Sequence, residues 1–237
     1  MPYLIRTWNL FHGNAVPPGR RAYLEEMIRL ATVDEPDVMC LQEVPLWALG
    51  RLGDWSGMLA AAAVARRPLL GSAALGGTLT SVHHGVLRSA FTGQANAILV
   101  RHDLRVRDEA VRQISRPREG ERRVCQALRI PGVGLVGNFH TTGAHADEQF
   151  RRAAAFVDEL AAAGEPVLLC GDTNVVPGDG STYDELRERG YSQPASVIDQ
   201  ILVRGAATTP ALVWDEERRR VEGRLLSDHA PVELHVG

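Results

Sequence analysis

In the segment Val167–Asn174, VLLCGDTN, four apolar residues precede a Gly-Asp pair, which is followed by Thr and Asn. A short apolar run bounded by turn residues is typical of a buried β-strand that ends at a turn. An aspartate after such a strand often only bonds its own backbone. Asp172 therefore gains a functional interpretation only if other strands of the chain end in the same way.

Other apolar segments share this ending, because each lies next to a polar side chain suited to bind a metal or a phosphate. These side chains are Asn9, Glu43 and His140 at the ends of segments 3–8, 38–41 and 135–139, and Asp228 with His229 just before segment 231–236. Strand ends in α/β proteins are where ligand sites collect, since the scaffold fixes the backbone while loops shape the pocket. The accumulation favours one composite site.

Further strands are predicted over 97–100 and 198–203, and helical patterns lie between several strands. Apolar residues within 24–31 and within 147–161 fall on one face of a helix. A third helix is predicted to open at Thr182, with Glu185 three residues later completing a capping box. Strands that alternate with helices indicate α/β layers.

Strands that follow one another without a helix indicate that part of the sheet is antiparallel, so a two-sheet core with helices outside fits both patterns. Residues 53–91 are rich in Ala, Gly and Leu with weak periodicity and receive no assignment. The 237 residues contain no repeat or low-complexity break. We therefore expect a single domain over 1–237.

Composition narrows the function classes. Apolar residues at 45% and charged residues at 23% are ordinary for a globular protein, and the net charge of −3 gives no broad electrostatic footprint for nucleic acid. The three cysteines lie in or beside apolar runs and are expected to be buried and reduced. No segment is long enough to span a bilayer, so the cytoplasm is the expected location, and no obligate protein partner is evident.

The sequence resembles the endonuclease/exonuclease/phosphatase superfamily, which includes pancreatic-type deoxyribonucleases, abasic-site endonucleases, sphingomyelinases and inositol polyphosphate phosphatases. The matching segments occur in the family's order and cover nearly the whole chain. They are Thr7–Asn9, Leu41–Val44, Asn96–Leu99, Asn138–His140, Gly171–Asn174, Ile198–Ile201 and Ser227–Val232. Each segment is weak alone, but seven in order form a strong signal.

The resemblance implies a four-layer α/β sandwich, with two mixed β-sheets face to face, helices outside, and the active site at one edge. It also implies that Asn9, Glu43 and Asp228 form the metal shell. Hard oxygen ligands of this kind suit Mg²⁺ or Mn²⁺. A metal also answers the charge problem, because unneutralised carboxylates would repel a phosphate.

Catalytic roles follow from the same resemblance. Asp172 is expected to orient and deprotonate the attacking water, and Asn174 to fix that carboxylate and help hold the phosphoryl oxygens. The other implied roles belong to His229 as transition-state stabiliser, Asp199 as the group that orients it, His140 as candidate proton donor to the leaving oxygen, and Asn96 as a phosphate contact. A positioned acid or base typically contributes on the order of 10²–10⁴-fold.

The chain departs from the family at two positions. Gln200 stands where the family often has His or Tyr, which predicts altered packing more than lost activity, and Thr173 replaces a common Phe. His140 at the Asn-x-His position is a feature of the deoxyribonuclease, sphingomyelinase and phosphatase branches, and disfavours the abasic-site repair branch.

Other polar residues receive ordinary interpretations. His83–His84 are expected in an exposed loop, and the Arg218–Arg220 run, which follows three acidic residues, in a surface hairpin. His12 follows Asn9 and could reach the substrate, but a solvated loop position is favoured. Arg122–Arg123 could face a phosphate pocket or solvent, and solvent is favoured. Lone or paired histidines seldom form a metal site without further ligands nearby.

Three functions remain open. The first is a metal-dependent phosphodiesterase or nuclease that acts on nucleic acid or a small phosphodiester. The second is a phosphomonoesterase for a sugar, inositol or lipid headgroup, and the third is a non-catalytic binding member of the fold. Specificity in such a fold belongs to variable loops, so the substrate is not identified.

Overall fold

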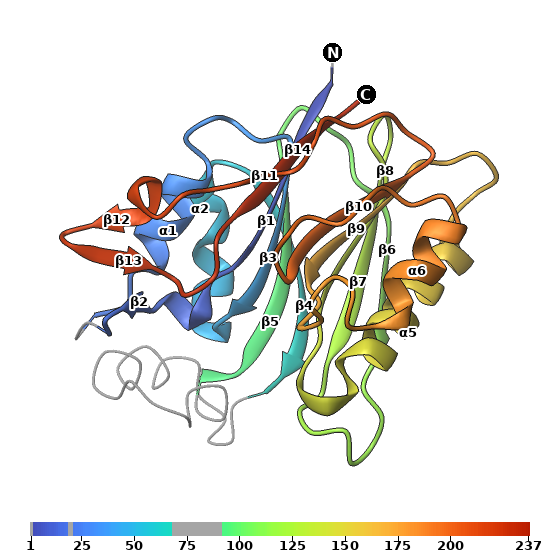
Figure 1. Ribbon diagram of the computed structural model, residues 1–237. Helices are drawn as coiled ribbons and strands as arrows, with labels where there is room; N and C mark the ends of the chain where they lie inside the picture. The colour runs from blue at the N-terminus through green and yellow to red at the C-terminus, as the bar shows by residue number, and fades with distance from the viewer. Residues whose placement is uncertain (1, 19–20, 68–91) are drawn as a thin grey trace.

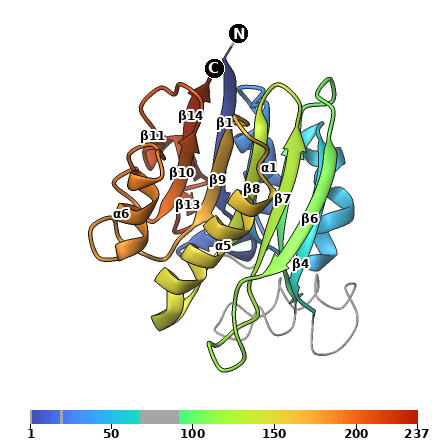
Figure 2. The same ribbon diagram turned by 90° about the vertical axis from the view of Figure 1, so that its right-hand side faces the viewer.

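The computed structural model describes residues 2–18, 21–67 and 92–237, and the predicted loop at His83–His84 lies outside these ranges. Two large sheets pack face to face, and helices cover the outer face of each (Figure 1). Figure 2 shows the second sheet face-on, with helix α5 lying across it. The predicted four-layer α/β sandwich is confirmed.

The first sheet has six strands in the order β11-β14-β1-β3-β5-β4. Their bounds are Leu212–Val213 (β11), Val232–Val236 (β14), Tyr3–Asn9 (β1), Val38–Val44 (β3), Gln94–Val100 (β5) and Leu59–Arg66 (β4). Strands β1 and β3 are parallel, while β14 and β5 run antiparallel to them. The sheet is therefore mixed, as expected.

The second sheet has five strands in the order β10-β9-β8-β7-β6. Their bounds are Asp199–Arg204 (β10), Val167–Asp172 (β9), Gly134–His140 (β8), Val124–Ile130 (β7) and Arg107–Gln113 (β6). Strands β8 and β9 are parallel, and the other neighbours are antiparallel. This sheet is mixed as well.

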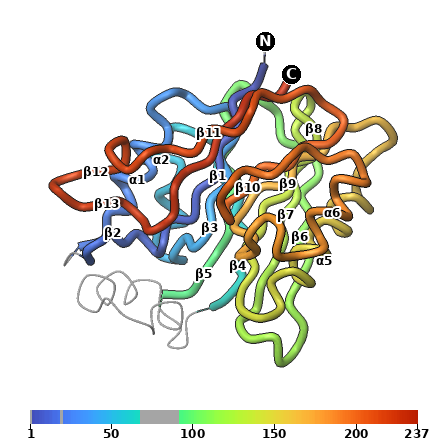
Figure 3. The backbone as a smooth tube through the Cα atoms, viewed as in Figure 1, coloured from blue at the N-terminus to red at the C-terminus, as the bar shows by residue number. Residues whose placement is uncertain are grey.

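Helices α1 (Leu24–Ala31) and α2 (Leu52–Ser56) cover the first sheet, and α5 (Ala146–Leu160) with α6 (Ser181–Glu188) covers the second. Short 3₁₀ turns span Phe11–Gly13, Leu46–Arg51, Gly143–His145 and Glu217–Arg219. A small third sheet joins β2 (Ala15–Val16), β13 (Arg224–Leu226) and β12 (Arg220–Val221) beside α1 (Figure 3). No helix in the described ranges is long and apolar enough to cross a membrane.

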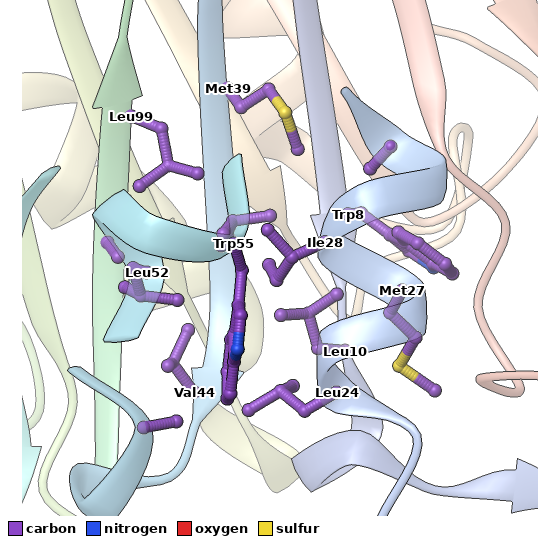
Figure 4. Close-up of a cluster of buried hydrophobic side chains, with 14 of the residues drawn as sticks. Trp8, Leu10, Leu24, Met27, Ile28, Met39, Val44, Leu52, Trp55 and Leu99 are labelled. Carbon is purple, nitrogen blue, oxygen red and sulfur yellow. The ribbon is translucent and has the colours of Figure 1, made fainter. Parts of the chain in front are cut away.

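Three hydrophobic clusters separate the four layers. Strand β9 explains why its sequence is a continuous apolar run: Leu168 and Cys170 face the cluster between the sheets, while Val167 and Leu169 face the cluster under α5. Both faces are buried, so the polar half of the usual alternation is missing. Figure 4 shows the third cluster, where side chains of α1 and α2 meet those of β1, β3 and β5. All three cysteines are buried and free, as predicted.

The first two sheets contain strands that the sequence pattern did not predict, namely β4, β6, β7 and β11. Strand β11 has only two residues, and the polar Gln126 and Arg129 interrupt the apolar run of β7. Strand β4 lies within the unassigned 53–91 segment and is mostly alanine, which is a weak strand former. Strand β6 is almost wholly exposed at the sheet edge, so it carries no apolar stripe. Edge strands that expose most of their side chains therefore escape pattern reading.

The predicted capping box at Thr182 is wrong. Helix α6 begins one residue earlier, at Ser181, and Thr182 lies inside it. The Asp147 side chain of α5 accepts a hydrogen bond from the Thr182 backbone N at 3.3 Å, and the Asp147 carbonyl accepts one from the Thr182 hydroxyl. A tertiary cap from α5 thus replaces the local one.

Candidate active site

The predicted site residues converge because parallel strands end at the same edge. Asn9 ends β1, and His140 and Asp172 end β8 and β9, where they are paired neighbours. Asn9 Nδ2 crosses from the first sheet to donate a 2.9 Å hydrogen bond to Asp172 Oδ2 in the second. Asp199 opens β10 directly opposite Asp172. One cluster therefore draws on both sheets.

The backbone at Gly171 brings β9 close to β8 just before Asp172. Its φ is +148°, and a Cβ at this position would lie 1.9 Å from the Phe139 carbonyl oxygen. Any other residue would push the two strands apart. The Gly-Asp pair that first resembled a simple turn is thus a requirement of strand packing at the site.

The Asp172 carboxylate lies at the centre of the cluster. Its Oδ2 is 3.3 Å from His140 Nε2 and 3.8 Å from His229 Nε2, and its Oδ1 accepts a 2.9 Å hydrogen bond from the Asn174 backbone N. Burial and the neighbouring Asp199 charge raise the pKa of Asp172 to about 7, against the opposing effects of His229 and the hydrogen bonds. Asp172 can therefore gain and lose a proton near neutrality.

His229 is held as a cation by Asp199. The two side chains form a 2.8 Å contact between His229 Nδ1 and Asp199 Oδ2. Burial opposes the charged ring, but the hydrogen bond to Asp199 and the charges of Asp199, Asp172 and Asp228 prevail and raise the pKa of His229 to about 10. The result is an imidazolium whose Nε2 lies 3.8 Å from Asp172 Oδ2.

The turn that carries His229 is clamped from below. Arg219 is 5% exposed, and its Nη1 donates to the carbonyls of Leu226, Ser227 and His229 at 3.0, 3.2 and 2.8 Å. Trp8 Nε1 donates to the same His229 carbonyl at 3.0 Å. The prediction that the Arg218–Arg220 run is only a surface hairpin is wrong for its middle residue.

His140 has the opposite surroundings. Its Nδ1 lies 3.1 Å from Gln94 Nε2 and 3.2 Å from Arg123 Nη1. A guanidinium only donates, so Nδ1 must accept and the ring proton is on Nε2. Burial, and next the Arg123 charge, place the pKa of His140 well below its usual value. His140 is a neutral donor.

Arg123 itself is 5% exposed, so the prediction that Arg122–Arg123 faces solvent is wrong for this residue. Burial lowers its pKa, while the charges of Glu121, Glu43 and Asp172 raise it. Gln94 was not identified from the sequence either. Its only signal was a polar residue at the start of an apolar strand, which many strands show.

Glu43 points into the cluster because β3 is irregular at this point. The β3–β5 register shifts between Leu41 and Val44, and Glu43 has a φ of +54°. Such a bulge re-aims a side chain. Glu43 Oε2 is 3.2 Å from His12 Nε2, and its Oε1 is 3.8 Å from His140 Nε2. His12 is 8% exposed, so its prediction as a solvated loop residue is wrong.

Left-handed backbone conformations gather around the site. Non-glycine residues with positive φ here are Phe11, His12, Glu43, Asn174 and Ser227, with values from 46° to 59°. Each costs of order 1–3 kcal/mol, and such residues persist where the surrounding structure enforces them. Asn9 Oδ1 accepts from the Phe11 backbone N at 3.0 Å, and Ser227 Oγ donates to the Asn9 carbonyl at 2.7 Å. This strain marks a functional edge.

Beneath the site, a buried polar bridge joins the two sheets. Asn138 of β8 is 0% exposed, and its Nδ2 donates to the carbonyls of Leu41 and Ala97 at 3.0 and 2.9 Å. Gln42 Nε2 donates to Asn138 Oδ1 at 2.8 Å and to Thr7 Oγ1 at 3.0 Å. Gln42 directly precedes Glu43, and Thr7 and Asn138 each lie two residues before Asn9 and His140. These bonds therefore fix the spacing of the strands that carry the site residues.

The remaining predicted residues occupy distinct places. Asn96 is buried and its Nδ2 donates to the Val124 carbonyl at 3.0 Å, which ties the two sheets. The Asn174 amide donates to the Thr141 carbonyl. Asp228 is exposed, with Oδ1 3.9 Å from His229 Nε2. Gln200 is buried and bonds the backbone of Ala195, so its effect is on packing.

The donor set suits a divalent cation. Asp172, Asp199 and His229 offer ligand atoms within 4.8 Å of one another. A cationic His229 that already bonds Asp199 has no lone pair for a metal. The remaining candidate ligands are the carboxylates and the amide around Glu43. Burial is the largest cause of the raised pKa of Asp172, and the neighbouring Asp199 charge adds a repulsion between the two carboxylates. A hard cation would relieve it.

The fold and the site define a class: four-layer α/β sandwiches with carboxylates, amides and histidines at the strand ends. The chain belongs to the Endonuclease/Exonuclease/phosphatase family, whose model matches residues 7–229. Members of this family are metal-dependent hydrolases of phosphoester bonds. The resemblance found in the sequence is thereby confirmed.

Similar solved structures extend over the whole chain. A functionally unknown conserved protein from Enterococcus faecalis is 18% identical, with 99% of each chain covered and a TM-score of 0.73. A mannosyl-6-phosphatase from Bacteroides thetaiotaomicron is also 18% identical, with 99% of each covered and a TM-score of 0.71. TDP2 from Caenorhabditis elegans is 16% identical over 100% of this chain and 74% of that one, with a TM-score of 0.65. No curated protein matches the sequence.

Proposed function

We propose that this chain hydrolyses phosphoesters with a divalent metal, Mg²⁺ or Mn²⁺, and that its substrates are phosphodiesters. The observation that carries the proposal is the Asp172 carboxylate, which lies within 4 Å of an amide and two imidazoles that are differently charged. A buried carboxylate with a pKa of about 7 is suited to accept a proton from water at neutral pH.

Asp172 acts as the general base. Asn9 and the Asn174 backbone N hold its two oxygens, so the carboxylate has one orientation. A water between Asp172 and the phosphorus would lose its proton to this group as it attacks. Preset orientation matters because it removes the entropic cost of finding the reactive geometry.

His229 stabilises the transition state. Its imidazolium, fixed by Asp199, places a positive N–H where negative charge develops on the phosphoryl oxygens. Such preset charge in a partly buried site is usually the largest single catalytic effect. The same N–H can protonate the leaving oxygen, since His229 carries a proton to give.

His140 donates a hydrogen bond but does not transfer its proton. Its neutral ring has one N–H, at Nε2, and losing that proton would create an imidazolate beside two carboxylates. We therefore assign it to hold a phosphoryl oxygen, in place of the proton donation expected from the resemblance. Asn96 is assigned to sheet packing, because its amide is already bonded to the Val124 carbonyl.

Asn9, Glu43 and Asp228 are proposed to hold the metal. When bound, the cation supplies charge neutralisation and polarises a phosphoryl oxygen. Glu43 is the main candidate ligand, because its carboxylate is 17% exposed and lies at the mouth of the cluster between two histidines. Asn9 holds Asp172 through its amide nitrogen. Its amide oxygen accepts one hydrogen bond from the Phe11 backbone N and has a second lone pair for the metal.

The experiment that tests the proposal is an assay of bis(4-nitrophenyl) phosphate with Mg²⁺, with Mn²⁺ and with chelator. We expect turnover with metal and loss of turnover with chelator. A parallel panel of phosphomonoesters, scored by released phosphate, separates diesterase from monoesterase activity. Absence of metal-dependent hydrolysis of every phosphoester would refute the proposal.

A further inference from the structure

A basic hollow lies beside the proposed active site. It has a volume of 430 Å³ and is lined by Val64, Ala65, Arg66, Arg67 and Arg122, at the end of β4 and in the turn before β7. Arg66 and Arg67 belong to one segment and Arg122 to a distant one, and the fold brings the two segments together. A shared hollow with three guanidinium groups is chemically suited to an anion.

Two of the three arginines are held in place by the protein. Arg122 Nη1 donates to the carbonyls of Val64 and Ala65, both at 2.9 Å, and its Nε donates to Gln113 Oε1 at 3.1 Å. Arg66 Nη1 contacts Glu121 Oε1 at 2.6 Å. Guanidinium groups that are already fixed lose less entropy when they bind a ligand.

The hollow is linked directly to the catalytic cluster. Arg66 is the β4 partner of Gln94 on β5, and the Gln94 amide reaches His140 Nδ1. Neighbouring strands are about 4.8 Å apart. Arg66 at the hollow therefore lies one strand away from Gln94, which contacts His140. Glu121 gives a second link, because its carboxylate contacts both Arg66 and Arg123, at 2.6 and 3.3 Å.

The balance of charge distinguishes this hollow from another of similar size. A 400 Å³ hollow near the start of α5 is also lined by arginines, but Arg152 there pairs with Glu119 at 2.8 Å and Arg151 with Glu185 at 2.9 Å. At the β4 hollow, one carboxylate, Glu121, contacts Arg66, and it is shared with Arg123. The described residues that line the β4 hollow include three arginines and no acidic side chain, whereas Glu119 and Glu148 are part of the lining near α5.

We propose that Arg66, Arg67 and Arg122 form a subsite for a second phosphate of the substrate, next to the phosphate that is hydrolysed. The inference rests on the proposed phosphoesterase function and names its substrate class. The favoured substrates carry two phosphates a short distance apart, as in a polynucleotide or a bisphosphorylated small molecule. Planar guanidinium groups bind such anions through paired N–H donors.

Binding is tested first, without catalysis. Inorganic phosphate is titrated into metal-free, ¹⁵N-arginine-labelled protein in the presence of chelator, and the Nε–Hε signals are followed. We expect the signals of the three subsite arginines to shift, and the double variant Arg66→Gln/Arg67→Gln to bind phosphate at least about tenfold more weakly, since charge-assisted hydrogen bonds are lost. Arg122 is kept intact because it also holds β4.

The matched control is Arg187→Gln on α6. This arginine is exposed and pairs with Asp184 at 2.8 Å, away from the hollow. We expect it to bind phosphate as the wild type does. Equal phosphate affinity in the double variant and the control, or no shift of the three signals, would overturn the subsite.

Catalysis gives the second test. The kcat/KM values for a thymidine dinucleotide are measured with and without a 5′-terminal phosphate, and for a bisphosphorylated sugar against its monophosphate. The double variant should reduce the preference for the doubly charged member by about tenfold in at least one pair. The pair that responds identifies polynucleotide or small molecule as the source. A preference unchanged in both pairs would overturn the proposal.

The two failures can be told apart. If phosphoesters are hydrolysed but the arginine signals do not respond to phosphate, the subsite is wrong and the proposed function stands. If the signals respond as expected but every phosphoester remains intact, the anion subsite stands and the proposed function is wrong.

Discussion

His140 and His229 approach the same carboxylate oxygen, Asp172 Oδ2, with their Nε2 atoms at 3.3 and 3.8 Å. On the β8 side, a guanidinium and an amide donate to His140 Nδ1, so that ring is neutral. On the β10 side, the Asp199 carboxylate accepts from His229 Nδ1, so that ring is a cation. Burial lowers the pKa of both rings; Arg123 adds to this effect at His140, whereas Asp199, with the other acidic charges, outweighs it at His229.

Two residues of the same type, His140 and His229, thus differ in charge because their surroundings differ. The positive Arg123 lowers the pKa of one imidazole after burial has done so, whereas Asp199 raises the pKa of the other against burial. The site thereby gains a neutral donor and a charged donor around a single base. Pairs of titratable groups whose surroundings separate their pKa values often mark acid and base roles.

Asp172→Asn removes the group that both histidines share and should have the largest effect. We expect kcat for bis(4-nitrophenyl) phosphate to fall by about 10⁴-fold, the upper end for loss of a general base. Melting temperature should not fall, because the amide keeps the shape without a buried charge. The control is Asp184→Asn, whose carboxylate is exposed on α6. A rate within tenfold of wild type would refute the role of Asp172.

Asp199→Asn breaks the β10 side of the comparison. The His229 ring then loses the carboxylate that raises its pKa most, so its pKa should fall and a smaller fraction of the rings should be charged at pH 7. We expect a loss of about 10²-fold in kcat, because the transition state more often meets a neutral donor in place of a cation. His229→Ala should be at least as inactive. Full activity of the asparagine variant would show that the charge of His229 is not used.

Arg123→Met breaks the β8 side. Without the guanidinium, His140 Nδ1 keeps only the Gln94 amide, which can rotate to offer its oxygen, so the ring can shift its proton to Nδ1. Loss of the positioned Nε2–H should reduce kcat/KM by about tenfold, the value of one hydrogen bond to a charged phosphoryl oxygen. Arg123→Lys should retain more activity because it still donates. Equal rates in the two variants would argue against the positioning role.

The two histidines should also give pH dependences of opposite sign in the metal-free protein. Folded His229 keeps its proton up to about pH 10. Its contribution to the unfolding free energy is therefore full below about pH 6.5 and declines as the pH rises toward 10. His140 stays neutral when folded, so its contribution is present above about pH 6.5 and is lost as the pH falls.

Urea unfolding in chelator, at several pH values, measures both slopes. His229→Gln should abolish the decline on the alkaline side, and His140→Gln should lessen the decline on the acid side. This is the smallest effect of the series, because each slope belongs to one ionisable group. Identical pH profiles for the two variants would contradict the assignment of a neutral His140 and a cationic His229.

The site residues at the strand ends could be predicted from the sequence, whereas the buried arginines that hold them in position could not. Asp172, His140 and Asn9 were identified because they end buried strands, and the strand pattern survives in sequence. Arg123 and Arg219 were placed in solvent, because an arginine in a charged run has no feature that distinguishes a buried partner from an exposed one. Their partners are ring nitrogens and carbonyls from distant segments.

The fold shows the same division. Strand β9 could be predicted because both its faces are buried, whereas β4 and β6 are exposed edges with weak or charged sequences. The position of Glu43 depends on a bulge and a left-handed backbone, which no apolar pattern records. Hydrophobic periodicity thus does not predict features that arise from tertiary contacts.

The most direct test of the neutral His140 and the cationic His229 is ¹⁵N–¹H NMR of the histidine ring nitrogens in metal-free wild-type protein at about pH 7.5, assigned with His140→Gln and His229→Gln. The account predicts that both nitrogens of His229 carry protons and that His140 carries one, on Nε2. A neutral His229, or a proton on Nδ1 of His140, would contradict it.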